Sequence, residues 1–148
     1  MADRHGPMRT GRFTVEIDDV EIAGWQSVTI PSSSTEVSEY RESDDPDFED
    51  IVLGATTFQD LEMTRGLQPG DTTLSDWREE VRAGNIDEAI KEVKVTLMDE
   101  EGEDVFRWVF EGSLLSYYDP PELDARVEGK VATETVTIVF DKMVEEEP

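Results

Sequence analysis

Apolar and polar residues alternate with a period of two in short segments along the whole chain of 148 residues. The pattern is clear in GRFTVEI (11–17), in KEVKVTL (91–97) and in VATETVTIVFDKM (131–143). A period of two puts every second side chain on the same face, as in a β-strand with one buried face. Such strands recur about every dozen residues without the rhythm of β-α-β units, so a mainly β fold is predicted, an antiparallel sandwich or barrel.

Turn residues join neighbouring strands into hairpins. Asp18 and Asp19 separate the first segment from VEIAGWQSVTIP (20–31), and DEEGED (99–104) lies between the two arms of a second hairpin. Acidic residues and glycine in such short connections are typical of tight turns. In the second hairpin the side chains of Val93, Val95 and Leu97 alternate on one arm, and those of Phe106, Trp108 and Phe110 alternate on the other.

One short helix is predicted at about residues 73–83, where the pattern changes to a helical period. Thr73 is suited to cap its N-terminus, and Gly84 stands where a glycine commonly follows a helix. This is expected to be the only helix of the chain. The apolar residues on its buried face are Leu74, Trp77 and Val81.

A long acidic excursion interrupts what is otherwise a hairpin pattern. The stretch EYRESDDPDFED (39–50) carries seven acidic side chains in twelve positions. A polar segment, PSSSTEVSEYRE (31–42), leads into it, and TTFQDLEMTRG (56–66) is predicted as the returning strand. Hairpin loops have about two to five residues, so an insertion of this length indicates a function, and a long protruding hairpin is predicted.

Charge constrains the environment and the partners of the chain. It has 37 acidic and 13 basic residues and a formal net charge of −24. Self-repulsion of this size disfavours nucleic acid and anionic membranes as partners. The acids are spread along the chain, which favours a folded protein from a high-salt cytoplasm over a disordered acidic tail, because roughly 1 M salt screens charges within about 3 Å.

The chain lacks the residues that most enzymes and metal sites require. It has no cysteine, and its one histidine, His5, lies near the N-terminus. The acidic stretch 44–50 lacks the glycine and the terminal glutamate of a calcium-binding EF-hand loop, and 99–104 is explained as a turn. We therefore expect no catalytic residues, no cofactor and no metal site, and the protein is not expected to be an enzyme.

One β domain is expected at residues 11–143, between a disordered N-terminus (1–10) and a solvated acidic C-terminal tail (144–148). The N-terminus has no apolar segment of a signal peptide, and no stretch is long and apolar enough for a transmembrane helix. The protein is therefore expected to be made in the cytoplasm and to have no membrane anchor.

Three longer patterns follow one another from about residue 12 to 143. FTVEIDDVEIAGWQSVTIPSSSTEVSEYRE combines a first hairpin, a Gly-Trp step and a Glu-Tyr-Arg-Glu segment. FQDLEMTRGLQPGDTTLSDWREEV is a strand that ends in Arg-Gly and is followed by a helix. VKVTLMDEEGEDVFRWVFEGSLLSYYDPPELDARVEGKVATETVTIVF contains Trp-x-Phe, a tyrosine-proline step and Val-Ala-x-Glu. In this order and spacing, the patterns resemble the tube proteins of contractile phage tails and of phage-tail-like injection systems, and more distantly the hemolysin-coregulated tube protein of type VI secretion.

This resemblance implies a structural subunit of an inner tube. Six copies would form a ring, and rings would stack into a hollow tube for cargo protein or DNA, with sheath, baseplate and cap proteins as partners in a phage tail or injection particle. The arm, from about Glu36 to Arg65, would reach from one ring to the next. Its acids would meet arginines of adjoining subunits, Arg126 among them. The residues expected at subunit and ring contacts are Tyr40, Arg41, Glu42, Asp44, Asp45, Asp47, Phe48, Arg65, Arg78 and Arg82.

A second hypothesis remains open at the level of sequence. A soluble acidic β-sandwich could bind a cationic protein or a divalent cation through its loops, and it would be a monomer with a saturable ligand. The sequence does not distinguish a viral particle from a host-encoded one, or the main tube protein from a related tube protein near the baseplate or cap. In tube proteins of this kind the hairpin insertion tends to be richer in basic residues, proline and glycine than SDDPDFED (43–50).

Overall fold

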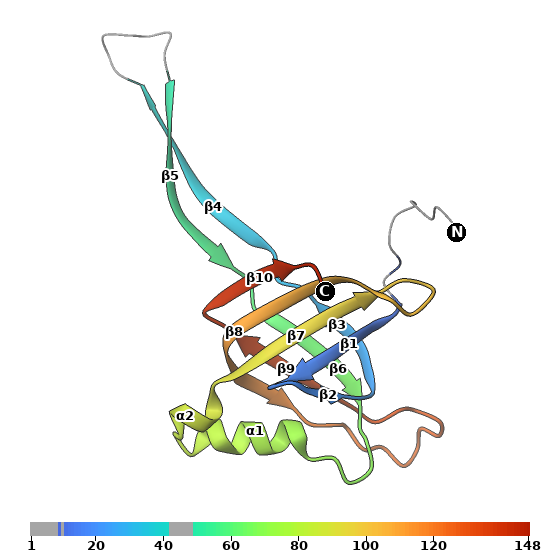
Figure 1. Ribbon diagram of the computed structural model, residues 1–148. Helices are drawn as coiled ribbons and strands as arrows, with labels where there is room; N and C mark the ends of the chain where they lie inside the picture. Colours follow the sequence, from blue (N-terminus) through green and yellow to red (C-terminus); the bar gives the residue numbers. More distant parts are fainter. Residues whose placement is uncertain (1–8, 10, 42–48) are drawn as a thin grey trace.

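The computed structural model describes residue 9 and residues 11–41 and 49–148. These residues form a mainly antiparallel β domain, as the alternating pattern predicts, with a hairpin that protrudes far from it (Figure 1). The elements are β1 (Phe13–Ile17), β2 (Val20–Ile22), β3 (Trp25–Thr29), β4 (Ser33–Arg41), β5 (Glu49–Phe58), β6 (Leu61–Gly66), α1 (Thr73–Arg82), α2 (Ile86–Ala89), β7 (Lys91–Met98), β8 (Asp104–Asp119), β9 (Thr133–Val139) and β10 (Lys142–Glu146).

The long strand β8 divides the body into two layers. Its first half pairs with β7 and β10, and its second half pairs with β9. We call β2, β1, β7, the first half of β8 and β10 the first sheet, and the second half of β8, β9, β6 and β3 the second sheet. Gly112 lies between the two halves with φ +66°, and a Cβ there would collide with the carboxylate of Asp141. Glycine therefore permits the bend that folds one strand into both sheets.

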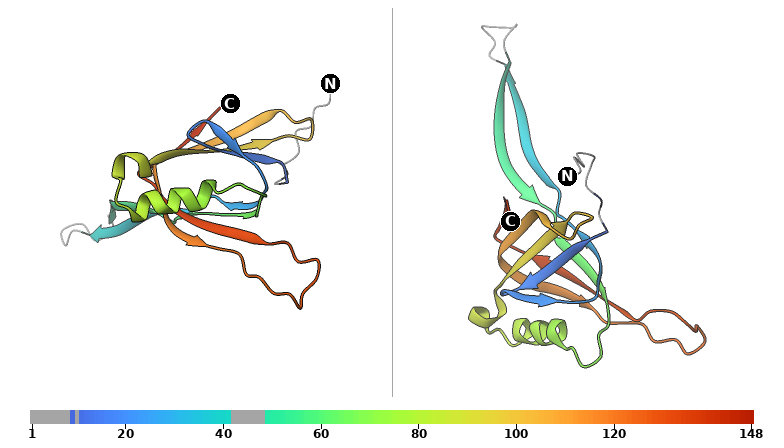
Figure 2. Two further views of the ribbon diagram at one scale, coloured as in Figure 1. Left: turned by 90° about the horizontal axis from the view of Figure 1, so that it is seen from below. Right: turned by 45° about the vertical axis from the view of Figure 1, so that its right-hand side comes forward.

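The hydrophobic core fills the space between the two sheets. Alternate residues of the strands point inward, as predicted for the two hairpins, and the first turn has positive φ at Asp18 and Asp19. Helix α1 lies across one open end of the body, and the protruding hairpin leaves from the other end (Figure 2). The core residues include Val15, Ile17, Leu61, Met63, Leu74, Trp77, Val93, Val95, Phe110, Leu115, Val136 and Ile138.

The helical region differs from the prediction in two details. A second helix, α2, follows Gly84, whose φ of +78° ends α1 as expected. The side chain of Thr73 does not cap α1. Instead, Asp71 Oδ1 accepts hydrogen bonds from the backbone N–H of Thr73 at 2.9 Å and from its hydroxyl at 2.6 Å. A carboxylate that precedes the helix thus satisfies an N-terminal N–H group.

The C-terminal segment also differs from the prediction. The closing strand predicted for 131–143 ends as β9 at Val139, and Asp141 donates its backbone N–H to Glu111 O at 2.9 Å. The chain then returns along β8 as β10, so the residues 144–146 expected in a solvated tail lie in a strand. Hydrogen bonds to the otherwise open edge of β8 stabilise this segment although it is acidic, and its glutamates remain exposed to solvent.

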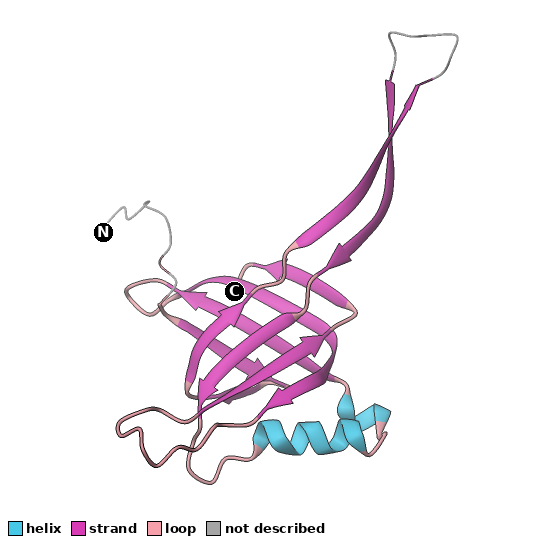
Figure 3. Ribbon diagram, turned by 180° about the vertical axis from the view of Figure 1, so that it is seen from behind, coloured by secondary structure: helices cyan, strands magenta, loops and turns pink. Residues whose placement is uncertain are grey.

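The protruding hairpin consists of β4 and β5, which pair only with each other among the described strands (Figure 3). We call residues 33–58 the arm. Its bounds correct the predicted arm and returning strand, because residues 61–66 are not part of it: β6 lies within the second sheet, between β9 and β3. The polar segment before the acidic excursion is itself a strand. Most of the excursion, residues 42–48, lies outside the described residues.

Candidate assembly interface

The arm exposes an apolar face that nothing in the described chain covers. Val37 pairs with Leu53, and Ile51 lies two residues before Leu53, so the three side chains share one face of the hairpin. Their exposed fractions are 57% for Val37, 66% for Ile51 and 71% for Leu53. A hairpin of two strands is at most marginally stable alone, and exposed apolar clusters mark interaction sites. We call Val37, Ile51 and Leu53 the arm's apolar face.

The base of the arm is fixed to the body by aromatic packing and a backbone hydrogen bond. The rings of Phe58 and Phe140 have centroids 5.9 Å apart, and those of Phe140 and Phe110 have centroids 5.1 Å apart. Gln59 donates its N–H to Ser32 O at 2.9 Å, which brings the two ends of the arm together. The buried Phe110 therefore connects the arm to the core, and the arm leaves the body in a defined direction.

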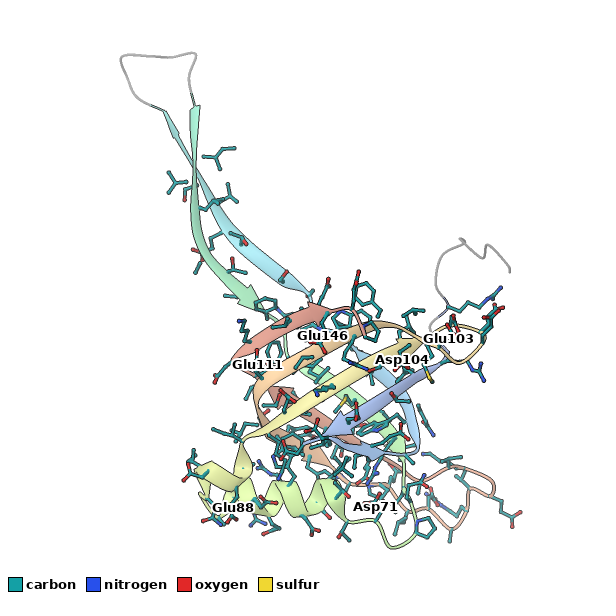
Figure 4. The ribbon with its side chains drawn as sticks, in the orientation of Figure 1. Asp71, Glu88, Glu103, Asp104, Glu111 and Glu146 are labelled. Atoms are coloured by element: carbon teal, nitrogen blue, oxygen red, sulfur yellow. The ribbon has the colours of Figure 1, made fainter. Side chains whose placement is uncertain are left out.

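A buried ionic network lies at the opposite end of β6. Arg65 is fully buried, and its Nε donates to Glu134 Oε2 at 2.7 Å while its Nη1 donates to Asp71 Oδ2 at 3.0 Å. Tyr118 donates its hydroxyl to the other oxygen of Glu134 at 2.6 Å. The guanidinium carbon lies 5.7 Å from the centroid of the Trp25 ring, within reach of a cation–π contact. The network joins the second sheet to Asp71, which lies just before α1 (Figure 4).

The network shifts the ionisation of two of its members. The hydrogen bond from Arg65, with two more from Thr73, lowers the pKa of Asp71 to about 2. Burial, followed by the hydrogen bond to Glu134, raises the pKa of Tyr118 to about 12. The two shifts widen the pH range over which Asp71 is ionised and the Tyr118 hydroxyl keeps the proton that it donates.

The structure corrects the expected role of Arg65. This arginine was predicted to meet acidic residues of an adjoining subunit, but its guanidinium is enclosed in its own domain and committed to Glu134 and Asp71. The physical reason is its position in β6, where it follows the inward-facing Leu61 and Met63 in the same alternation. The sequence indicates this burial, because residues 61, 63 and 65 have the same parity in a strand and therefore share one face.

Arg78, Arg82 and Arg126, which were also proposed as contacts, have intramolecular partners at or near the surface. Arg78 Nη1 donates to the backbone oxygens of Leu115 at 3.4 Å and Ser116 at 3.2 Å. Arg82 pairs with Glu79 at 2.6 Å, and Arg126 pairs with Asp124 at 3.0 Å. Exposed pairs such as the last two are weak, so these two side chains can exchange partners.

The residues predicted at the arm tip fall in a part of the chain that is described only in its backbone or not at all. The backbones of Tyr40 and Arg41 lie in β4. Glu42, Asp44, Asp45, Asp47 and Phe48 lie outside the described residues. Their roles as subunit contacts stay predictions.

In the described part of the chain, the body has open strand edges on β2, β3 and β10, besides those of the arm and of the second half of β8. β2 pairs with β1, β3 pairs with β6, and β10 pairs with β8. An open edge presents N–H and C=O groups that can pair with a strand of another chain. The sequence did not identify these edges, because strand order depends on contacts between distant segments.

Within residues 11–41 and 49–148, no cluster of three or more histidine, cysteine or acidic side chains is arranged to hold a metal ion. No helix of the described chain is long and apolar enough to cross a membrane. The features that stand out are mechanical: a stiff β body, an arm with an uncovered apolar face, and open strand edges. Together they define a subunit built for assembly with other chains.

Comparison with known families agrees with this class. The family model described as T4-like virus tail tube protein gp19 matches residues 9–144. The chain therefore belongs to this tail tube family, which confirms the resemblance in the sequence, and it is a structural subunit of a tail tube. A comparison with curated proteins gave no significant match.

Solved structures share the whole fold. A chain from the PVC sheath-tube complex of an extracellular contractile injection system, in the extended state, is 21% identical with a TM-score of 0.83, and the match covers 98% of this chain and 95% of that chain. A chain from the anti-feeding prophage cap is 18% identical with a TM-score of 0.83, covering 100% and 96%. Hcp1 from Flavobacterium johnsoniae is more distant, at 14% identity and a TM-score of 0.58, covering 92% and 95%.

Proposed function

We propose that six copies of this chain form a ring, and that rings stack into a hollow tube inside a contractile sheath. The observation that carries this proposal is the arm, a two-stranded hairpin that extends away from the body with an uncovered apolar face. A monomer gains nothing from such an arm, whereas a neighbour that covers it removes apolar surface from water. Membership of the tail tube family supports the same reading.

The contacts that build the tube are of two kinds. Within a ring, the open edges of β2, β3 and β10 are available for pairing with a neighbouring subunit. Between rings, the arm packs its apolar face against a subunit of the next ring. Both contacts are heterologous, since one patch meets a different patch, and such contacts produce closed rings and open-ended stacks.

The partners follow from the same proposal. One similar chain comes from a complex of sheath and tube, and another from a cap that terminates a tube. We expect this chain to be enclosed by a sheath protein, to begin on a baseplate and to end at a cap. Its lumen would carry a cargo protein or DNA, and shortening of the sheath would drive the tube through a target envelope.

We also expect the rings to assemble in a high-salt environment. A net charge of −24 on each subunit opposes the close approach of copies at low ionic strength. At roughly 1 M salt, repulsion between surface charges is screened beyond about 3 Å. A halophilic microbe or its virus would therefore provide the conditions in which these rings are stable.

The arm can be tested by two substitutions on adjacent residues that face opposite ways. Leu53→Ser removes an aliphatic side chain from the apolar face, while Val52→Ser, 53% exposed, changes the other face of the same strand. We expect L53S to abolish or strongly reduce tubes in electron micrographs at molar salt, with V52S close to the unsubstituted chain. Equal assembly by both variants would contradict the role of this face, and circular dichroism would verify that both fold.

A further inference from the structure

In the part of the chain that the structure describes, no helix covers the outer face of either sheet of the body. Helices α1 and α2 lie at one end of the body and the arm at the other, so neither covers the outer face of either sheet (Figure 2). In a hollow tube, a subunit with two such faces turns one of them toward the channel and the other toward the sheath. The two faces carry different side chains, and this difference indicates which of them turns toward the channel.

The outer face of the second sheet is made largely of hydroxyl groups. Its strand residues alternate with the buried Met63, Val136 and Ile138, so they point away from the core. Thr64 and Thr135 are cross-strand partners whose hydroxyl oxygens lie 2.9 Å apart. We call this surface the hydroxyl face; its hydroxyl-bearing members are Ser27, Thr29, Thr64, Tyr117, Thr133, Thr135 and Thr137, and the apolar Leu114 and Val139 lie on the same side.

The hydroxyl face is poor in charge for so acidic a chain. Its carboxylates are Glu62 and Asp119, which are cross-strand partners of Thr137 and Thr135. In the second sheet, β3, β6, β9 and residues 113–119 of β8 contain one basic residue, Arg65, and it points inward. The face therefore offers no cation to its surroundings. Threonines in cross-strand pairs also stabilise the sheet, and their β-branched side chains have restricted χ1 angles.

The outer face of the first sheet carries charges of both signs. Lys94 binds Asp19 at 3.1 Å, and Arg107 lies 3.5 Å from carboxylate oxygens of both Asp104 and Glu146. Several of its acids lie along β8 and β10 (Figure 4). We call this surface the charged face; its charged members on the strands are Glu16, Glu21, Glu92, Lys94, Arg107, Glu111, Lys142 and Glu146.

From these two surfaces, and resting on the proposed tube, we propose that the hydroxyl face lines the channel and that the charged face turns outward. A narrow channel with low-dielectric walls concentrates the potential of the charges on its wall. Six copies of a charged face would bring like charges toward one axis, whereas on the outside the same charges are separated and screened by salt. The arrangement with the lower electrostatic cost places the hydroxyl face inside.

The same assignment identifies the kind of cargo that moves freely along the wall. Lysines and arginines bind anionic groups, and the charged face presents Lys94, Arg107 and Lys142. The hydroxyl face presents none, and its threonines exchange hydrogen bonds with water. An anionic cargo would meet no ion-pair partner in the channel, so the wall is a passage surface and not a binding site.

The chain contains no cysteine, so single cysteines can report which face is inside. Thr137→Cys samples the hydroxyl face and Glu111→Cys the charged face. Tubes assembled at molar salt would be treated with a small maleimide and with a polyethylene-glycol maleimide too large to enter the channel. We expect both variants to react with the small reagent, and T137C to lose its labelling by the large reagent on assembly while E111C keeps it.

If the large reagent labels assembled T137C as fast as it labels assembled E111C, the assignment of the channel wall is wrong, although the tube itself still forms. If the unsubstituted chain forms no rings or tubes, the proposed function fails, and the assignment fails with it. Should T137C alone not assemble, Thr29→Cys reports on the same hydroxyl face from the edge strand β3. Protection of T29C would support the assignment, and free labelling would contradict it.

Discussion

Arg65 shows how much one buried side chain contributes to a fold of this kind. It neutralises Glu134, which is 2% exposed, and binds Asp71 at the start of the helical segment. Removal of one partner from a buried ion pair leaves an uncompensated charge, which typically costs about 3–5 kcal/mol. Replacement of both partners by apolar residues avoids that cost.

We therefore expect Arg65→Met to lower the free energy of unfolding by about 3–5 kcal/mol, and the double variant R65M/E134L to lower it by less than R65M alone. Urea denaturation followed by circular dichroism at molar salt measures both. The single variant Glu134→Leu is measured in the same way. If the double variant loses as much free energy of unfolding as R65M and E134L lose together, the two side chains are not energetically coupled.

Asp71 gives the network a signature at low pH. Its pKa is about 2 in the folded chain against an ordinary value of 3.8, so the ionised carboxylate stabilises the fold. This stabilisation is fully present above the ordinary pKa and is lost as pH falls toward the folded pKa. We expect the difference in unfolding free energy between the unsubstituted chain and Asp71→Asn to shrink from pH 4 to pH 2. A difference that stays constant across this range would contradict the assigned pKa.

At the scale of elements, the arm is separable from the body. Ser32 and Gln59 are joined by a backbone hydrogen bond of 2.9 Å, and Ser33 pairs with Phe58. Residues 34–57 can therefore be replaced by the two-residue turn Asn-Gly, which suits a tight hairpin. Phe58 and its packing against Phe140 are retained.

We expect this shortened chain to keep the β-sheet circular dichroism and the cooperative unfolding of the full chain, because the core lies in the body. We also expect it to form no tubes at any salt concentration. Sedimentation velocity and electron microscopy measure assembly. Tubes formed without the arm would show that contacts between bodies are sufficient.

The alternation of residues predicted the strands of the body well, because a half-buried strand leaves a local pattern. It also predicted the inward side chains of the second hairpin, such as Val93 and Phe110. The break after Val139 was missed because Phe140 keeps the phase of Val136 and Ile138, although Lys142 and Met143 no longer follow it, and the return along β8 depends on pairing with a distant strand. Arg65 was missed because a charged residue was interpreted as a surface residue, although its parity with Leu61 and Met63 indicated burial.

The arm itself could be predicted as an insertion, but its apolar face could not. Val37 and Leu53 come together through the register of β4 and β5, which contains a bulge between Thr35 and Val37. The acidic tip is the conspicuous feature of the sequence, whereas the uncovered aliphatic side chains lie in the described part of the arm. Register and edges depend on pairing between distant segments, which a local pattern does not determine.

At the scale of the whole molecule, charge and shape act against each other. The arm and the open edges favour association, and a net charge of −24 opposes it at low salt. Because salt screens the repulsion, and kosmotropic salts also strengthen apolar burial, assembly is expected to increase with ionic strength. A soluble binding module would behave differently, since its oligomeric state would not respond to salt and it would bind a cationic or divalent ligand saturably.

The most direct test of this account is negative-stain electron microscopy of the purified chain at low and at molar salt, with sedimentation of the same samples. We expect rings or hollow tubes of uniform width that become more abundant as salt increases. A monodisperse monomer at every salt and protein concentration would contradict this expectation.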